Sequence, residues 1–106
     1  MIKTVVVTQK DIDTAIKEIR ERRQKMGVSS HSDICPLARA LSRATGKKIS
    51  VGFDTYGPTN YERANLPLEL FEFRELFDHS EYFGNLKHIK PKRFKVDIPD
   101  QFIAKK

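Results

Sequence analysis

The sequence contains a single cysteine, Cys35, among 106 residues. One cysteine cannot form an internal disulfide, which excludes the class of small secreted proteins held together by disulfides and suits a reducing compartment. No apolar run approaches the ~20 residues that span a bilayer, and the apolar stretch within residues 1–8 is too short and too polar-flanked for a signal peptide. We therefore expect a cytoplasmic protein that does not contact a membrane.

Motifs of the common catalytic and metal-binding classes are also missing. The sequence has no Gly-rich dinucleotide fingerprint, no phosphate-binding Gly-Lys-Ser/Thr loop, no His-Glu-x-x-His pair and no Cys-x-x-Cys. Cys35 lies near His31 and Asp33, but a lone cysteine before a proline at an apolar helix start is more typical of a small buried side chain than of a nucleophile. His31, Cys35, His79 and His88 lack zinc-ligand spacing. We predict a non-enzymatic protein with no catalytic residue, cofactor or metal.

Composition predicts one folded, basic domain. Hydrophobic residues make up 39% of the chain and charged residues 32%, which allows a buried core. The length suits a single domain, assigned to residues 1–99, with 100–106 as a short C-terminal tail. Lysine and arginine total 20 against 14 acidic residues, and the net charge of +6 favours anionic partners.

Hydrophobic patterns predict the order strand, helix, helix, strand, helix, strand. The β-branched run 2–7 predicts a strand, and Thr8 with Asp11 forms a helix N-cap pattern that opens a helix ending at Gly27. Cys35 and Pro36 are expected as N-cap and first residue of a second helix that Gly46 ends.

The second half continues with a strand over 49–53 and a loop over 54–65. A third helix opens at Leu66 and Pro67 and ends before a turn at 78–85, and the last strand covers 94–98. The resulting fold class is α+β, or small α/β, with a three-stranded sheet and three helices.

The second helix carries the first candidate site. Arg39 and Arg43 are four residues apart on the side away from its apolar residues, and Lys47 follows the helix end. An arginine fork can hold two phosphate oxygens, which would make this surface a phosphate grip. The alternative is an ordinary solvated helix face.

The loop over 54–65 carries the second candidate site. Tyr56, Asn60, Tyr61 and Arg63 combine aromatic rings, an amide and a guanidinium, the groups that stack a base and hold a phosphate. The same residues could belong to a simple connection.

Two further surfaces suggest partners. The basic run from Lys87 to Lys95 could contact nucleic-acid backbone, or it could be the outward face of an edge strand that lysines protect from other sheets. Leu68, Phe71 and Leu76 lie off the main apolar stripe of the third helix, which suggests an oligomer interface.

Several motifs resemble those of small proteins encoded by tailed bacteriophages and prophages. The resemblance is carried by Cys35-Pro36-Leu37-Ala38-Arg39-Ala40-Leu41, by Leu66-Pro67, by Phe77-Asp78 and by the closing 94–99 strand. It implies a phage accessory protein in the host bacterial cytoplasm. Many such proteins counter host defence by capturing a nucleotide-type signal, by binding nucleic acid or by blocking a defence protein.

Three functional hypotheses follow. The leading one is a homo-oligomer that sequesters a phosphorylated, nucleotide-like small molecule, with Arg39, Arg43 and Arg63 on phosphate and with Tyr56 and Tyr61 on the base. The second is a nucleic-acid-binding protein that uses the 87–95 run. The third is an inhibitor that binds a host defence protein directly.

Overall fold

The structure is a computed structural model that describes residues 1–26, 34–82 and 89–105. The predicted stop at Gly27, the loop 28–33 and the segment 83–88 lie outside the described residues. The elements in chain order are β1 (Ile2–Val7), α1 (Gln9–Met26), α2 (Pro36–Thr45), β2 (Ser50–Val51), β3 (Thr55–Gly57), β4 (Ala64–Asn65), α3 (Leu68–Tyr82), β5 (Lys92–Asp97) and the 3-10 turn η2 (Asp100–Phe102). The predicted α+β class with three helices is confirmed.

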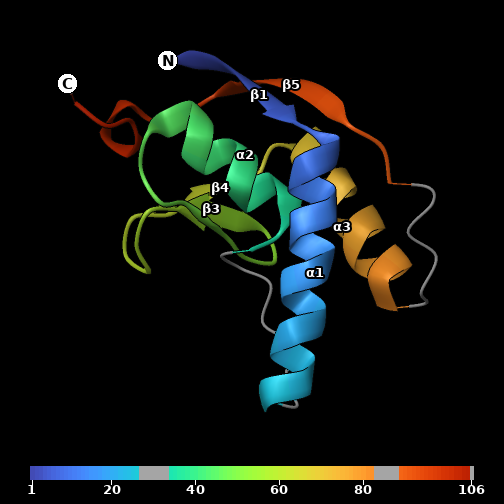
Figure 1. Cartoon of the computed structure of the whole chain (residues 1–106). Coiled ribbons are helices and arrows are strands. Elements are labelled where there is room, and N and C mark those ends of the chain that lie inside the picture. The colour runs from blue at the N-terminus through green and yellow to red at the C-terminus, as the bar shows by residue number, and fades with distance from the viewer. Residues whose placement is uncertain (27–33, 83–88, 106) are drawn as a thin grey trace.

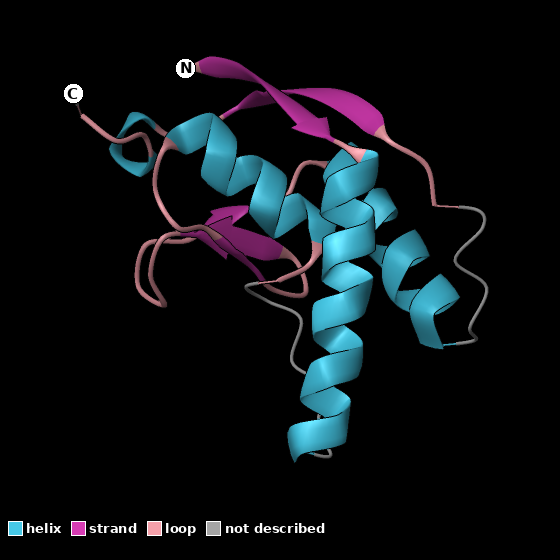
Figure 2. Cartoon of the chain, in the orientation of Figure 1, coloured by secondary structure: helices cyan, strands magenta, loops and turns pink. Residues whose placement is uncertain are grey.

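The strands form two small antiparallel sheets, where the sequence suggested one. β1 pairs with β5, so that the first and last strands lie side by side, and β2, β3 and β4 form the other sheet. Helix α2 contacts both β1 and β2 and lies between the sheets (Figure 1). Helices α1 and α3 stand beside this arrangement, and the β1–β5 pair forms an outer layer (Figure 2). We call this pair the β1–β5 ribbon.

The first two of the three predicted helix starts are confirmed, and the third helix begins at Leu68, directly after Leu66 and Pro67. The Thr8 N–H donates to Asp11 Oδ2 at 2.9 Å and the Asp11 N–H donates to Thr8 Oγ1 at 3.1 Å, which forms a reciprocal capping box at α1. The Ala38 N–H donates to Cys35 Sγ at 3.3 Å, and Pro36 is the first residue of α2. Gly46 ends α2 with a φ of 76°, the left-handed conformation expected of a helix stop.

The segment 54–65 differs from the prediction because it contains two strands. Both are very short, and they lie among Gly, Pro and Asn residues, so no periodic pattern reveals them. The turn between β2 and β3 is closed by the Gly52 N–H, which donates to the Thr55 carbonyl at 2.8 Å. Gly57 admits no side chain, because a Cβ there would lie 1.8 Å from the Glu62 carbonyl oxygen.

Two boundaries also differ. Helix α3 continues to Tyr82, through residues that were expected to form a turn. Within the predicted tail over 100–106, residues 100–102 form η2, where the side chain of Phe102 is only 1% exposed and meets the Tyr56 ring edge to face at 5.6 Å. Residues 100–102 therefore belong to the domain.

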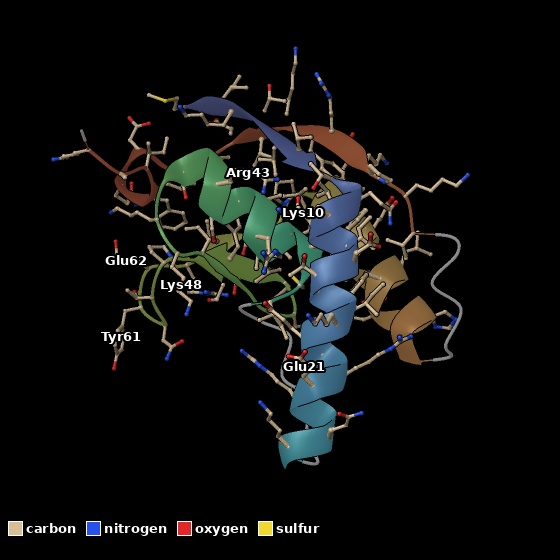
Figure 3. The ribbon with its side chains drawn as sticks, in the orientation of Figure 1. Lys10, Glu21, Arg43, Lys48, Tyr61 and Glu62 are labelled. Atoms are coloured by element: carbon tan, nitrogen blue, oxygen red, sulfur yellow. The ribbon has the colours of Figure 1, made fainter. Side chains whose placement is uncertain are left out.

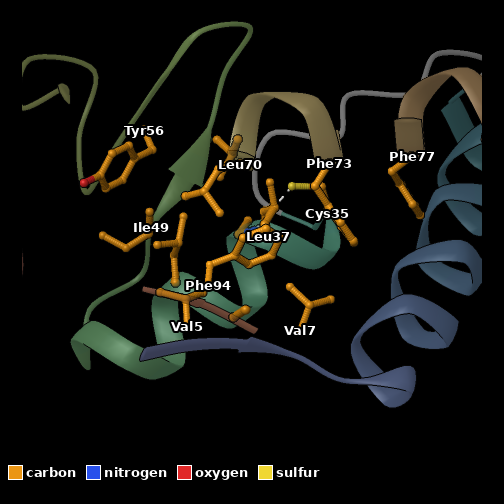
Figure 4. Packing of buried hydrophobic residues seen from close by; sticks show 14 of the residues in the cluster. Val5, Val7, Cys35, Leu37, Ile49, Tyr56, Leu70, Phe73, Phe77 and Phe94 are labelled. Atoms are coloured by element: carbon orange, nitrogen blue, oxygen red, sulfur yellow. Dashed lines mark hydrogen bonds between the residues drawn. The ribbon is translucent and has the colours of Figure 1, made fainter. Parts of the chain in front are cut away.

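The core gathers side chains from all three helices and from both sheets. The predicted stripe of α3 is buried at Leu70, Phe73 and Phe77, and Phe73 packs edge to face on Phe94 of β5 at 5.7 Å. From the ribbon, Val5 points into the same core (Figure 4). The ribbon is therefore apolar on its inner face.

The packing of η2 leads to the first prediction. Phe102→Ala should lower the free energy of unfolding by about 3–5 kcal/mol, because it removes a fully buried ring and leaves a cavity against Tyr56. Urea denaturation measures the change. The exposed neighbour Gln101→Ala is the matched control and should change stability by less than about 0.5 kcal/mol. Equal stability of the two variants would show that the C-terminal segment is not part of the core.

Candidate functional site

The first predicted site is a structural ion pair. Arg43 donates from Nη1 to Asp11 Oδ1 at 3.0 Å and from Nη2 to Asp11 Oδ2 at 2.7 Å, a bidentate contact. Its Nη2 also donates to the Val6 carbonyl at 2.7 Å. The Asp11 side chain is 5% exposed, whereas that of Arg43 is 53% exposed. The guanidinium is therefore already held by a buried carboxylate and by the backbone of β1.

The electrostatics of Asp11 show the strength of this arrangement. Burial alone raises the pKa of the Asp11 carboxyl, but the hydrogen bonds from Arg43 and Thr8 outweigh burial and lower that pKa below its ordinary value of 3.8. Asp11 therefore stays ionised at neutral pH and neutralises Arg43.

Arg39 is also directed toward acidic groups. Its Nη1 lies 3.5 Å from Glu18 Oε1, and its Nε lies 3.9 Å from Asp11 Oδ1. This Nε is buried and has no hydrogen-bond acceptor among the described residues. Lys47, the third cation of the predicted grip, donates from Nζ to the Gln101 carbonyl at 3.0 Å. Arg43, Arg39 and Lys47 thus already contact oxygen atoms of the protein, and the structure does not leave them as free phosphate contacts.

Two residues of the predicted loop site, Tyr56 and Arg63, have side chains that take part in the packing and hydrogen bonding of the fold. Tyr56 is 1% exposed, so its ring is not available to stack on a base. The same burial raises the pKa of its hydroxyl. The Arg63 guanidinium bonds to three residues of the β2–β3–β4 sheet: Ser50 Oγ at 2.7 Å, the Thr55 carbonyl at 3.0 Å and the Gly57 carbonyl at 3.3 Å. Arg63 therefore stabilises this sheet. Because its guanidinium already donates to these oxygens, it is not free to hold a phosphate.

Asn60 and Tyr61 remain exposed at the tip of the loop between β3 and β4. The Tyr61 side chain is 96% exposed and lies far from Arg43 (Figure 3). The Tyr61 N–H and the Glu62 N–H donate to Thr59 Oγ1 at 3.2 and 2.9 Å, which shapes the turn. The structure does not bring the aromatic and cationic halves of the predicted nucleotide site together.

The predicted interface residues lie on different sides of α3. Phe71 packs edge to face on Phe53 at 5.8 Å, and Arg74 covers both rings at 5.1 and 5.3 Å. Leu76 lines a cleft of about 270 Å³ between α3 and the segment before β5, and Leu68 is 70% exposed. The three residues do not form one apolar surface.

The Cys35 thiol is buried, and burial raises its pKa to about 12. A thiol protonated at physiological pH is a poor nucleophile, so the interpretation of Cys35 as a small buried side chain is confirmed. His31 and His88 lie outside the described residues. The part of the chain that the structure describes contains no group of His, Cys, Asp or Glu placed to hold a metal ion, and no helix in it is long and apolar enough to cross a membrane.

The β1–β5 ribbon carries exposed basic residues that are not used in internal contacts. Opposite residues in the register share a face, and Val5 and Phe94 face the core. Thr4 opposite Lys95 and Val6 opposite Arg93 therefore face outward. Arg93 and Lys95 are exposed, and neither forms an ion pair with any described residue. Alternation around Phe94 and Val96 predicted an outward face here, but the sequence could not show that β1 lies beside it.

Lys90 and Lys92 extend the basic surface at one end of the ribbon. Lys90 precedes the strand, and the Lys92 Nζ lies 5.4 Å from the centre of the Phe94 ring. Both lysines also line the cleft beside Glu69 and Glu72 of α3. Lys87, the first residue of the predicted basic run, lies outside the described residues.

Comparisons with protein-family models, with curated proteins and with solved structures found no match. The resemblance to phage-encoded proteins therefore stays a prediction. The functional argument rests on the geometry of this chain.

The ion pair at Asp11 leads to the second prediction. Arg43→Ala should lower the free energy of unfolding at neutral pH by about 1–3 kcal/mol, because it leaves a buried carboxylate without its main partner. In the wild type the lowered pKa of Asp11 contributes stability above pH 3.8 that is lost as pH falls through the folded-state pKa. The difference between variant and wild type should therefore shrink at pH values below 3.8.

Urea denaturation over this pH series measures the effect. Arg20→Ala is the matched control, because Arg20 is exposed on α1 and has no partner among the described residues. A loss of stability in Arg43→Ala that stays constant down to the lowest pH would show that Asp11 is not the group responsible.

Proposed function

We propose that the protein binds nucleic acid through the outward face of the β1–β5 ribbon. The observation that carries this proposal is the position of Arg93 and Lys95, which extend from the outer layer of the fold without an acidic partner among the described residues. Unpaired cations on a rigid strand are suited to contact successive phosphates of a nucleic-acid backbone.

The shape of the ribbon supports the same function. A two-stranded antiparallel ribbon fits the major groove of B-form DNA, where side chains on its outward face reach phosphates and base edges. Thr4 and Val6 occupy the outward face of β1 beside Lys95 and Arg93. A hydroxyl can donate to or accept from a base edge, and an apolar side chain can contact a thymine methyl group.

Neighbouring acidic residues restrict where a polyanion can lie. Glu69 and Glu72 adjoin Lys90 and Lys92 at the α3 side of the ribbon, where they would repel phosphate. At the opposite end of β5, Asp97 and Asp100 are bound by the Met1 ammonium at 3.0 and 3.2 Å. Between these two ends, residues 2–7 and 92–96 of the ribbon include no aspartate or glutamate.

Capture of a nucleotide-like signal has less support from the geometry. Arg43 is bound to Asp11, Arg63 to the β2–β3–β4 sheet, and Tyr56 lies in the core. That hypothesis and direct inhibition of a host protein stay predictions, as does the absence of enzymatic activity.

Replacement of the ribbon cations provides the third prediction. The double variant Arg93→Ala/Lys95→Ala should weaken binding to a fluorescently labelled DNA duplex and reduce the slope of log affinity against log salt by about 2 in magnitude, about one for each lost phosphate contact. Fluorescence anisotropy at several salt concentrations gives both quantities. Both side chains are exposed, so stability should change little.

The double variant Lys25→Ala/Lys48→Ala is the matched control. It removes the same net charge from exposed positions. Lys25 lies in the last turn of α1, the end far from the ribbon (Figure 1), and Lys48 follows α2 away from the ribbon (Figure 3). It should retain nearly the wild-type slope. Equal losses in both double variants would indicate nonspecific attraction to a basic protein, and absence of DNA binding by the wild type at low salt would reject the proposal.

A further inference from the structure

The register of the ribbon determines which backbone groups of β1 remain unpaired. Met1 and Ile98 exchange both backbone hydrogen bonds, each at 2.9 Å. Because hydrogen-bonded and non-hydrogen-bonded pairs alternate in an antiparallel sheet, Lys3 and the buried valines of β1 direct their backbone groups toward β5. The N–H and C=O groups of Ile2, Thr4 and Val6 therefore point away from β5, toward the other edge of β1.

An independent contact confirms this assignment. The Val6 carbonyl accepts from Arg43 Nη2 at 2.7 Å, which requires that it points away from β5. The backbone groups of Ile2 and Thr4 have no partner in the described part of the chain. The Met1 ammonium binds Asp97 and Asp100 on the β5 side, so it does not cover this edge. The outer edge of β1 is therefore open at Ile2 and Thr4, whereas at Val6 it is contacted by Arg43 of α2.

The two edges of the ribbon are protected unequally. The outer edge of β5 carries Arg93 and Lys95, and charged side chains discourage pairing of an edge strand with another sheet. The outer edge of β1 carries Ile2, Thr4 and Val6, all uncharged and all β-branched, and Ile2 is 70% exposed. These residue types favour extended pairing, so β1 is the edge suited to accept another strand.

We propose that β1 pairs with β1 of a second copy of this chain, antiparallel and about a twofold axis at Thr4. Thr4 then lies opposite its own counterpart, and Ile2 lies opposite Val6 of the other copy. Each of these pairs exchanges both backbone hydrogen bonds. The Val6 carbonyl can accept a second hydrogen bond beside that of Arg43 because it has two lone pairs.

Neighbouring registers are less favourable. An axis at Lys3 would place two lysines directly opposite each other, and like charges in such pairs are destabilising. An axis at Val5 would place Ile2 opposite Thr8, whose N–H already donates to Asp11 at 2.9 Å and which is followed by α1, so Ile2 would lose its pairing. The axis at Thr4 avoids both conflicts and pairs Ile2, Thr4 and Val6 with the same three residues of the other copy, so this edge is complementary to itself.

The pairing would form a continuous four-stranded sheet in the order β5, β1, β1 and β5. Its outward face would carry Thr4 and Val6 of both copies in the middle and Arg93 and Lys95 along both sides. Dimerisation would thus double the basic surface of the proposed nucleic-acid interface. The dimer itself depends only on the β1 edge, so it is tested without nucleic acid.

Loss of a single edge donor provides the fourth prediction. Wild-type protein in sedimentation equilibrium should move from 12.3 kDa toward twice this mass as concentration rises into the high micromolar range. Thr4→Pro should remain monomeric, because proline removes the N–H that points to the second copy and removes no bond between β1 and β5. Lys95→Pro is the matched control: it removes the corresponding donor on the outer edge of β5 and should still dimerise.

Circular dichroism and urea unfolding establish that each proline variant is folded. Crosslinking provides a second measurement that does not depend on proline. Thr4→Cys should form an intermolecular disulfide under mild oxidation, because the Cα atoms of such a pair lie about 5.5 Å apart, within disulfide range. Lys95→Cys should not, and the buried Cys35 should not compete.

Wild-type protein that stays at 12.3 kDa at all concentrations would overturn the proposal. A folded Thr4→Pro variant that associates as the wild type does would also overturn it, as would crosslinking through Lys95→Cys in place of Thr4→Cys. A dimer that fails to bind DNA would reject only the proposed function.

Discussion

The buried carboxylate of Asp11 connects three elements of the fold. It accepts from the Thr8 N–H where β1 ends, it lies in the first turn of α1 and takes part in the capping box of that helix, and it holds Arg43 of α2 in a bidentate contact. The same guanidinium reaches the Val6 carbonyl, which fixes α2 against the edge of β1. The position of the outer layer relative to the core therefore depends on one acidic group, and both sheets are arranged around the helix that this group positions.

Several arginines of the chain are used, like Arg43, in contacts within the protein. Arginines with partners serve the interior of the fold: Arg43 binds Asp11, Arg63 binds the β2–β3–β4 sheet, and Arg74 binds Asp78 at 2.6 Å. A planar guanidinium can satisfy several oxygen acceptors at once, which suits it to such positions. The exposed positive charge at the ribbon comes mainly from lysines and from Arg93. A net charge of +6 therefore says little about where an anion would bind until the internal partners are known.

Local features of the sequence predicted the local features of the fold. Cys35, Pro36 and Gly46 define α2 through backbone geometry that depends on a few neighbouring residues, and these assignments were correct. Contacts between distant residues were not predictable in this way. Arg43 and Asp11 are 32 positions apart, so the face of α2 appeared free to bind phosphate. Strands β3 and β4 were not predicted because they are too short to show a periodic pattern. Their sheet is also held by hydrogen bonds from the Arg63 side chain to Ser50 and Thr55, which a strand pattern does not reveal.

The pairing of β1 with β5 has a consequence for how the chain acquires its structure during synthesis. Ile2 lies opposite Asp97, so the outer layer joins residues from nearly the two ends of the sequence. Closing so long a loop is slow compared with forming a helix, and its entropy must be overcome before the pairing contributes stability. On the ribosome, β1 therefore has no partner strand until β5 has been synthesised. During that interval its β-branched, uncharged edge has no intramolecular partner, so the proposed pairing between two copies would begin between neighbouring nascent chains on a polysome.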